Sequence, residues 1–307
     1  MVKDWYGSDG ISNKSLYGTD GNDKLGVYGS RSRTSLYGGA GNDEISLLQG
    51  DDNVVFAGDG DDKVEWDPWA GWLMPTNASV YGGNGSDYID VSSGSANTNH
   101  NYNVYGGNDN DVIMGSNGAD SLYGNAGNDY IVGNDDSWGW TDAGDVIVGC
   151  EGNDTILAGA GDDQITGDAA DIDASLHGSD VLYGDTGNDN LWGNAGDDSL
   201  AGGTGADWLI GGQGNDKLWG SYVGDDKEMD VFVFRTAEGQ QVDEVMDFES
   251  GYDGVWCQDG AFTKAEIHGN DLWAYAGDDR GMIIHNAVGK TIKWANSDGK
   301  INVYKVG

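Results

Sequence analysis

Aliphatic residues recur along this chain at steps of about nine, and the residues between them are mostly glycine, aspartate and asparagine. Each aliphatic residue sits in a segment of about three residues that reads as a short strand, and its side chain points inward because side chains alternate along a strand. A strand of that length cannot stand alone. The pattern predicts an all-β solenoid in which two repeats make one coil, with one strand on each face.

The expected inward residues follow one another from the first repeat to the last. They are Leu16, Leu25, Leu36, Ile45, Val54, Val64, Val80, Ile89, Val104, Ile113, Leu122, Ile131, Ile147, Ile156, Ile165, Leu182, Leu191, Leu200, Leu209, Leu218 and Phe232.

The clearest repeats run without a break from Gly184 to Trp219 as GDTGNDNLW, GNAGDDSLA, GGTGADWLI and GGQGNDKLW. Their glycines allow a tight, partly left-handed turn. The aspartate at the sixth position turns a carboxylate and nearby carbonyl oxygens toward one point, and such a flexible, oxygen-rich shell suits Ca²⁺ better than Mg²⁺. The alternative, a disordered Gly/Asp-rich linker, would not place an aliphatic residue at every eighth position.

The motif therefore predicts multiple Ca²⁺ sites. Turns that keep both diagnostic glycines end at Asp23, Asp43, Asp87, Asp120, Asp129, Asp154, Asp189, Asp198, Asp207 and Asp216. Turns that depart from the motif end at Asp52, Asp62, Asp111 and Asp163. The strongest sites are expected where intact turns stack two repeats apart, with Asp189 beside Asp207 and Asp198 beside Asp216.

These nonapeptides resemble the RTX (repeats-in-toxin) family of calcium-binding β-rolls over about three quarters of the chain, from Gly7 to Phe234. The resemblance implies a right-handed parallel β-roll, of about ten coils here. It also implies a bacterial protein that is extracellular or at the cell surface, exported by the type I pathway without an N-terminal signal peptide. The segment Asp230–Trp256 is similar to the element that closes RTX rolls.

Acidic residues number 53 against 15 basic ones, and 45 of the 53 are aspartates. Between Lys63 and Lys217 there is no lysine or arginine, so bound cations must neutralise this region. Such a field disfavours nucleic acid as a partner, and no apolar run is long enough for a transmembrane segment. The two cysteines, Cys150 and Cys257, are expected to be free thiols.

Five steps of the pattern are longer than nine residues, and counting parity places four of the insertions on one edge of the coil. The fifth, around Asp171–His177, would join them if it concealed a degenerate strand. Two insertions carry tryptophans that could serve as partner contacts or as lids over the apolar edge, and these residues are Trp66, Trp69, Trp72, Trp138 and Trp140.

An aromatic column is expected on the outside of one face, at the ninth position of alternate repeats: Tyr17, Tyr37, Val55, Tyr81, Tyr105 and Tyr123. Stacked tyrosines would stabilise one another across parallel strands. A flat surface of this kind would also suit lateral self-association.

The domain organisation predicted is a β-roll over residues 1–234, followed by a small antiparallel β cap with a secretion-signal region over residues 235–307. Neither an H-E-x-x-H nor a G-x-S-x-G motif occurs, and roll and cap together leave no room for a catalytic domain. The chain is expected to be no enzyme but a structural or adhesive protein that self-assembles as a homopolymer. The alternative is a calcium-dependent module binding a cell-surface glycan or host surface, and a polysaccharide-modifying enzyme is a third reading.

Overall fold

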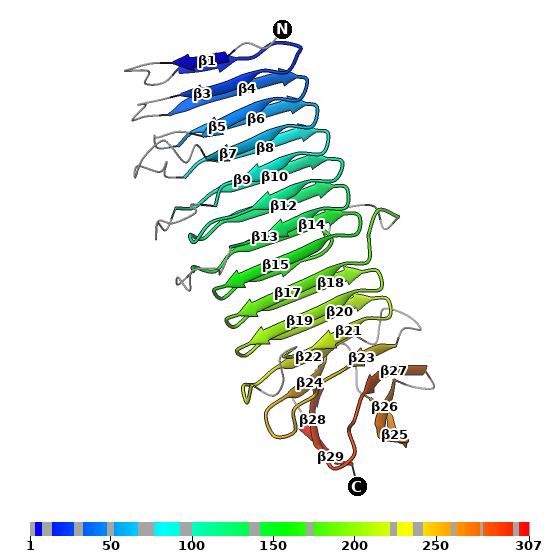
Figure 1. The fold of residues 1–307 in the computed structure, drawn as a ribbon. Coiled ribbons are helices and arrows are strands. Elements are labelled where there is room, and N and C mark those ends of the chain that lie inside the picture. Colours follow the sequence, from blue (N-terminus) through cyan, green and yellow to red (C-terminus); the bar gives the residue numbers. More distant parts are fainter. Residues whose placement is uncertain are drawn as a thin grey trace. The chain divides into compact units, whose positions relative to one another are not determined.

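The computed structural model describes residues 4–7, 14–27, 33–47, 52–66, 77–92, 100–134, 142–169, 173, 175–221, 226–235, 242–258, 262–276, 279–296 and 301–306. Their regular structure consists of β-strands (Figure 1). The chain divides into two compact units, residues 1–160 and 161–307. Among the described residues, no helix is long and apolar enough to cross a membrane.

Unit 1 is built from two parallel sheets whose strands alternate along the chain. The odd sheet contains β1 (Asp4–Gly7), β3 (Lys24–Val27), β5 (Glu44–Leu47), β7 (Lys63–Trp66), β9 (Tyr88–Asp90), β11 (Val112–Met114), β13 (Tyr130–Val132) and β15 (Thr155–Ala160). The even sheet contains β2 (Lys14–Tyr17), β4 (Thr34–Ala40), β6 (Val54–Asp59), β8 (Ser79–Asn84), β10 (Asn103–Asn108), β12 (Ser121–Ala126) and β14 (Val146–Glu151).

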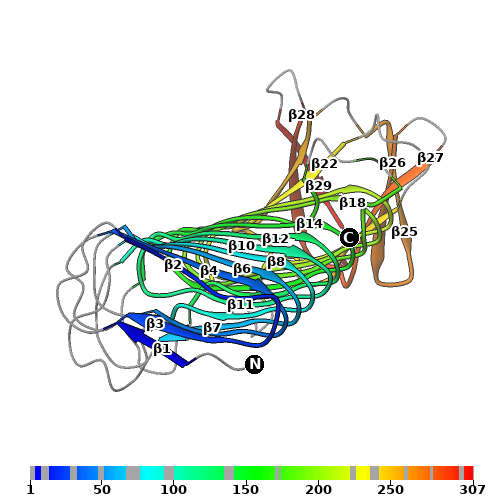
Figure 2. The same cartoon turned by 90° about the horizontal axis from the view of Figure 1, so that it is seen from above.

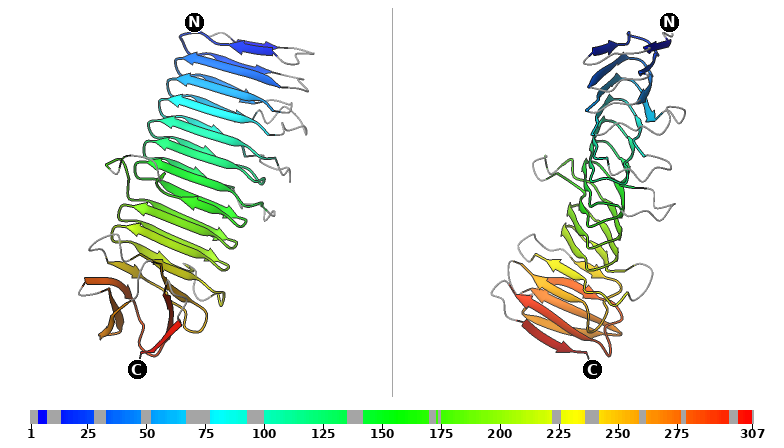
Figure 3. Two further views of the ribbon diagram at one scale, coloured as in Figure 1. Left: turned by 180° about the vertical axis from the view of Figure 1, so that it is seen from behind. Right: turned by 90° about the vertical axis from the view of Figure 1, so that its left-hand side faces the viewer.

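Each strand of unit 1 pairs in parallel with the strand two places away in the chain, so each sheet is built of every second strand. Figure 2 shows the two sheets as two layers of a flattened coil, and Figure 3 shows the coils stacked one above another. The prediction of a parallel β-roll is therefore confirmed.

The interior of each coil is filled by the aliphatic residues that the nine-residue steps identified. Ile89, Ile113 and Ile131 are fully buried and stand opposite one another on neighbouring strands of the odd sheet. Val80, Val104 and Leu122 form the matching column of the even sheet. Because each short strand shares this core with the strand facing it and with the coils on either side, no single coil could bury its aliphatic residues alone.

The structure corrects the predicted register at one coil. Val55, not Val54, is the buried residue of β6 and pairs with Leu36. Phe56 then takes the outward aromatic position expected for Val55. The segment LLQGDDNVVF lacks the paired glycines that mark a turn elsewhere, and adjacent valines make either register plausible from sequence. Pairing with β4 and β8 decides between them.

Unit 2 repeats the alternation and ends in antiparallel strands. One sheet runs β17 (Val181–Thr186), β19 (Ser199–Thr204), β21 (Lys217–Trp219), β23 (Asp243–Val245), β27 (Asp279–Ile284), β26 (Asp271–Ala276) and β25 (Lys264–His268). The other runs β16 (Gln164–Thr166), β18 (Asn190–Ala195), β20 (Trp208–Gln213), β22 (Val231–Phe234), β24 (Gly254–Cys257), β28 (Thr291–Asn296) and β29 (Ile301–Lys305).

The antiparallel strands expected at the C-terminus are confirmed in β25–β26–β27 and β28–β29. They join the roll through parallel pairs of β23 with β27 and of β24 with β28. Parallel pairing thus continues beyond residue 234, and the predicted border between roll and cap lies inside unit 2.

The insertions fall into two groups, according to whether they follow an odd strand or an even strand. In unit 1, the segments around residues 67–76, 93–99 and 135–141 all lie in turns from an odd strand to the next even strand, as parity counting predicted. In unit 2, the insertion between Leu218 and Phe232 is also such a turn. The insertion between β16 and β17 is a turn from an even strand to an odd one, and its described residues contain no further strand, so it does not join the others.

The corrected register of β6 makes a direct prediction for stability. Val55→Ala should lower the free energy of unfolding by about 2 kcal/mol, because it removes buried methyl groups from a packed coil. Val54→Ala, at the outward neighbour, should stay within about 0.5 kcal/mol of the parent chain. Urea unfolding at saturating Ca²⁺ measures both changes in the free energy of unfolding. A larger loss for Val54→Ala than for Val55→Ala would show that Val54 is the inward residue, as predicted from the sequence.

Candidate metal centre

Most of the described repeat turns reverse the chain through two backbone positions with positive φ. In the turn Gly184–Asp189, these positions are Asp185 (φ 71°) and Gly187 (φ 146°). The next turn uses Asn194 (φ 77°) and Gly196 (φ 136°) in the same places. Glycine and asparagine recur at the second and fourth positions of the motif because they tolerate this left-handed conformation at the least cost.

The sixth-position aspartates stack from coil to coil in what we call the aspartate ladder. One carboxylate oxygen, Oδ1, accepts the backbone N–H of the ladder residue in the preceding coil. Asp43 accepts from Asp23 at 2.8 Å and Asp62 accepts from Asp43 at 2.7 Å. The series continues in unit 1 through Asp87, Asp111, Asp129 and Asp154.

Unit 2 carries two such series. One connects Asp163, Asp189, Asp207, Asp230 and Asp253, and the other connects Asp180, Asp198, Asp216 and Asp243. The donor–acceptor distances in these two series lie between 2.8 and 3.2 Å. Each carboxylate therefore fixes the spacing and register of two adjacent coils.

The second carboxylate oxygen, Oδ2, is buried without a hydrogen-bond partner in much of the ladder. This holds for Asp43, Asp62, Asp87, Asp111, Asp129, Asp189, Asp198 and Asp207. Buried acceptors are normally satisfied, and one left bare costs free energy. These oxygens require a partner that the described protein atoms do not supply.

Most of the bare oxygens lie against the first glycine of their own turn, in a space that a Cβ would fill; Asp62, whose turn begins with Ala57, is the exception. A Cβ on Gly82 would lie 2.3 Å from Asp87 Oδ2 and 2.3 Å from the carbonyl oxygen of Gly106 in the next coil. At Gly193 the distances would be 2.2 Å to Asp198 Oδ2 and 2.5 Å to the Gly211 carbonyl oxygen. Oxygens of adjacent coils thus converge beside a residue that has no side chain.

Burial makes the ladder carboxyls poor acids in the absence of a cation. Desolvation raises the pKa of Asp198 to about 8, the N–H bond from Asp180 opposes the shift, and the charges of Asp216 and Asp180 add to it. The pKa of Asp189 also rises to about 8, and that of Asp87 to about 7, in both cases chiefly through desolvation. A divalent cation beside these groups would favour their charged forms.

The donor set fits calcium. Carboxylate and carbonyl oxygens are the ligands that Ca²⁺ prefers, and it accepts about six to eight of them in flexible geometry. No cluster of three or more His, Cys, Asp or Glu side chains suited to a metal occurs among the described residues, so backbone carbonyls must supply most ligands. A bound Ca²⁺ would neutralise the buried carboxylates and occupy Oδ2, while the protein keeps Oδ1 on the neighbouring coil.

Comparison with known families agrees with this chemistry. The model of the RTX calcium-binding nonapeptide repeat matches residues 28–54, 79–95, 105–137, 141–171, 178–209 and 201–221. The chain is an RTX calcium-binding repeat protein. A comparison with curated proteins finds no match. Proteins with RTX repeats are typically secreted by bacteria.

Of the aspartates predicted as RTX calcium ligands, all but one occupy the ladder. They are Asp23, Asp43, Asp62, Asp87, Asp111, Asp120, Asp129, Asp154, Asp163, Asp189, Asp198, Asp207 and Asp216, each at most 2% exposed. Asp52 is the exception, because it is exposed and the neighbouring Asn53 takes the ladder position, accepting the Thr34 N–H at 3.0 Å. The same one-residue difference in register that places Val55 inward places Asn53, rather than Asp52, in the ladder.

The ladder also contains aspartates that the RTX motif does not identify, namely Asp145, Asp180, Asp230, Asp243 and Asp253. Insertions separate these residues from the glycines of the RTX motif, or the glycines are missing. Each still stands two residues before a buried aliphatic or aromatic residue, as in Asp145–Ile147 and Asp230–Phe232. The shorter sequence pattern, an aspartate followed two residues later by an apolar residue, identifies all five of these aspartates.

The two edges of unit 1 differ in their supply of carboxylates. Turns from even to odd strands place an aspartate in every ladder position from Asp23 to Asp154. Turns from odd to even strands instead place Thr34, Asn53, Ala78 and Tyr102 there, before Asp120 and Asp145. In unit 2, ladder aspartates stand on both edges. In unit 1, the ladder carboxylates that could hold calcium are therefore concentrated in the turns from even to odd strands.

The fifth position of the repeat carries a second, exposed ladder. Asn42 Oδ1 accepts the Asp61 N–H at 3.3 Å, and Asn128 Oδ1 accepts the Asn153 N–H at 2.8 Å. In unit 2, Asp197 Oδ1 accepts the Asn215 N–H at 2.8 Å. These side chains satisfy backbone donors at the surface of the turn, which explains why asparagine and aspartate are frequent at a nominally variable position.

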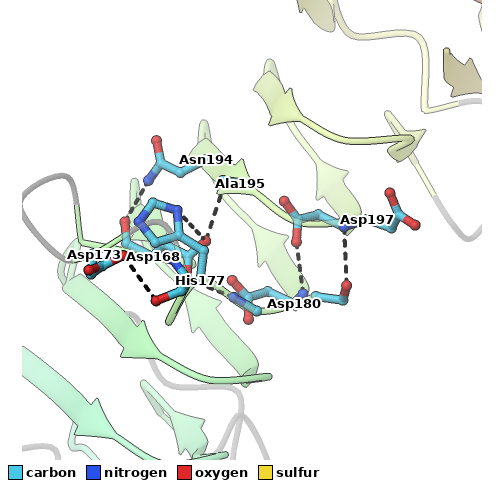
Figure 4. A network of polar contacts seen from close by, with 11 residues as sticks. Asp168, Asp173, His177, Asp180, Asn194, Ala195 and Asp197 are labelled. Carbon is cyan, nitrogen blue, oxygen red and sulfur yellow. Dashed lines mark hydrogen bonds and ion pairs between the residues drawn. The ribbon is translucent and has the colours of Figure 1, made fainter. Parts of the chain in front are cut away.

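The inserted loop between Gly167 and Gly178 is closed by its own polar contacts (Figure 4). Asp168 is buried and accepts the N–H of Gly178 at 3.1 Å and of Ala195 at 3.3 Å. His177 Nδ1 lies 3.5 Å from Asp168 Oδ2. The two backbone hydrogen bonds to Asp168 hold the base of the insertion, and the ladder continues after it at Asp180.

The predicted tryptophan contacts fall outside the described side chains. The backbone of Trp66 ends β7, while Trp69, Trp72, Trp138 and Trp140 lie in segments that the structure does not describe. Their role as contacts or lids stays a prediction.

Ladder position predicts the calcium requirement for folding. Asp198→Ala and Asp62→Ala should each cost about 1–3 kcal/mol, because each leaves a backbone N–H without its acceptor and removes a ligand oxygen. Asp52→Ala should change the stability by less than about 0.5 kcal/mol. Calcium titrations followed by circular dichroism give the folding midpoints, and equal midpoints for all three variants would contradict the ladder assignment.

The raised carboxyl pKa values predict that the metal-free chain is more stable in acid. The folded state binds more protons than the unfolded state between about pH 4, near the unfolded pKa, and about pH 8, the highest folded pKa. Stability is therefore present below this range and is lost as pH rises through it.

In excess chelator, the β signal in circular dichroism should increase as pH falls from about 8 toward 5. Asp111→Asn should weaken this dependence, whereas Asp52→Asn serves as an exposed control. A metal-free spectrum that does not change with pH would contradict the prediction.

Proposed function

We propose that this protein is a non-catalytic structural or adhesive component of the bacterial exterior, which folds when it meets extracellular calcium and then self-assembles. The observation that carries the proposal is the continuous ladder of buried carboxylates with bare Oδ2 atoms. A fold built on these groups is incomplete without a divalent cation, so metal binding contributes directly to folding free energy.

The calcium dependence favours an extracellular site of action. Extracellular calcium modules bind at about 10⁻⁴ to 10⁻³ M, concentrations that the cytosol does not reach. A chain with net charge −38 and few cations in its central repeats would remain expanded by self-repulsion until calcium is available. Export through a type I pathway, which passes unfolded chains, fits this behaviour.

A non-catalytic role is supported by what the polar groups do. Most buried carboxylates serve the ladder, and Asp168 holds the base of a loop by accepting two backbone N–H groups. His285 lies between Glu244, at 3.0 Å, and Asp271, at 3.3 Å, where it connects β23 with the C-terminal strands. Each of these groups has a structural role.

The second candidate function is calcium-dependent binding of a cell-surface glycan by the tryptophan insertions. Three insertions of unit 1 each follow an odd strand and precede an even one, as do the turns with fewer ladder carboxylates. Aromatic residues are common anchors in binding sites, and two of these insertions, between β7 and β8 and between β13 and β14, carry tryptophans.

The test compares assembly with binding. Purified chain should be largely unfolded in chelator, gain β structure in millimolar Ca²⁺, and then associate as its concentration rises. Circular dichroism, sedimentation and negative-stain imaging follow these steps.

Saturable polysaccharide binding by a monomer that never associates would favour the second function. An ordered β spectrum in chelator would remove the calcium-folding step. Trp138→Ser with Trp140→Ser should abolish glycan binding without affecting calcium-dependent folding if the loops are the binding face.

A further inference from the structure

The outer face of the even sheet of unit 1 carries an aromatic column with a regular spacing. Tyr17, Tyr37, Phe56, Tyr81, Tyr105 and Tyr123 stack with ring centroids 4.7–5.1 Å apart and interplanar angles of 2–12°. Strand pairing places each ring directly beside the next. The faces of the inner rings are covered by their neighbours, so the column forms a continuous ridge of ring edges and hydroxyl groups.

Beside this ridge runs a column almost without side chains. Two residues further along the same strands stand Gly39, Gly58, Gly83 and Gly107, with Asn125 and Cys150 at the end. The four glycines have φ between 115° and 132°, so the turn requires them and their lack of a side chain is built into the fold. The ridge and this column, which we call the glycine groove because its four glycines carry no side chain, therefore lie parallel on one face, about 7 Å apart along each strand.

The third outward column on the other side of the ridge is uncharged as well. It consists of Ser15, Ser35, Val54, Ser79, Asn103, Ser121 and Val146. The outer face of the odd sheet differs, since it carries Lys24 paired with Glu44 and Lys63 paired with Glu65. In a chain with net charge −38, these three columns are ones that two copies can bring together without burying charge, while Asp59 and Glu151 directly follow the groove positions Gly58 and Cys150 at the rim.

We propose that this face pairs with the same face of a second copy, with the aromatic ridge of each copy lying in the glycine groove of the other. The inference rests on the proposed self-assembly and assigns its surface and symmetry. A two-fold axis parallel to the stack of coils, midway between ridge and groove, superposes each ridge on the partner's groove. A two-fold axis along the strands would instead bring ridge against ridge.

Two properties favour a second copy over an unrelated partner, and the area of the face indicates how strongly the copies pair. The spacing of the rings in one copy matches the spacing of the coils in another over the whole length of the face. The face is self-complementary, as a two-fold interface must be. Seven strands and three columns span about 30 by 20 Å, or about 600 Å² per copy, which is below the roughly 800 Å² of a standard interface. The pairing is therefore weak and concentration-dependent.

Sedimentation velocity in millimolar Ca²⁺ tests the surface. The combined variant Phe56→Ser, Tyr81→Ser and Tyr105→Ser should weaken association at least about tenfold, since buried aromatic anchors dominate interface energies. Tyr130→Ser, an exposed tyrosine on the odd sheet, is the matched control and should associate like the parent chain. Circular dichroism confirms that each variant folds.

A cross-linking experiment tests the symmetry without altering the ridge rings. Val148 of β14 continues the ridge column and Cys150 continues the groove column. A chain carrying Val148→Cys and Cys150→Gly is mixed with the parent chain and treated with a short thiol cross-linker. The φ of 90° at Cys150 suits glycine, and the second native thiol, Cys257, is buried. Links between the two kinds of chain should predominate over links between like chains.

The outcomes separate the two proposals. A parent chain that folds in calcium but stays monomeric at all concentrations refutes self-assembly itself. Association that persists unchanged in the triple variant leaves self-assembly standing and overturns this surface. An associated sample without cross-links between the two kinds of chain overturns the ridge-in-groove symmetry. In the ridge-against-ridge arrangement the order of coils is reversed, so Val148→Cys of one copy lies at the opposite end from Val148→Cys and Cys150 of the other, and few links of either kind form.

Discussion

The aspartate carboxylate has two oxygens with different tasks, and the rest of the structure depends on that division. Oδ1 accepts a backbone N–H from the neighbouring coil and sets the distance between coils. Oδ2 is buried over a glycine and has no protein partner in much of the ladder. The first oxygen makes the stack regular, and the second makes the stack dependent on a cation.

This arrangement explains the composition of the chain. Aspartate is short enough to reach from one coil to the next while lying over its own turn, and glycine leaves room for it there. The absence of lysine and arginine between Lys63 and Lys217 follows, because the charge to be neutralised lies inside the turns, where long side chains could not reach it. The aliphatic core needs only one residue per strand because each coil also packs on its neighbours.

Most of the fold could be predicted from sequence because the repeat is local and its period is nearly constant. Where the period held, as from Gly184 to Trp219, strand, turn and ladder positions were all identified. At Asp52 the prediction was wrong, since two valines and three consecutive polar residues allow two registers and only pairing with Leu36 decides between them. Asp145 and Asp230 were missed because insertions separate them from their glycines, so the turn is complete in space but interrupted in sequence.

The one-dimensional stacking has a mechanical consequence. A tensile load applied at the two ends of the chain is transmitted from coil to coil, and each coil contacts mainly the coils before and after it. The roll should therefore extend by releasing coils in succession, and a coil whose carboxylates hold calcium should resist longer than one with Asn53 or Ala78 in the ladder position. Calcium concentration would then set the stiffness of the molecule as well as its folding.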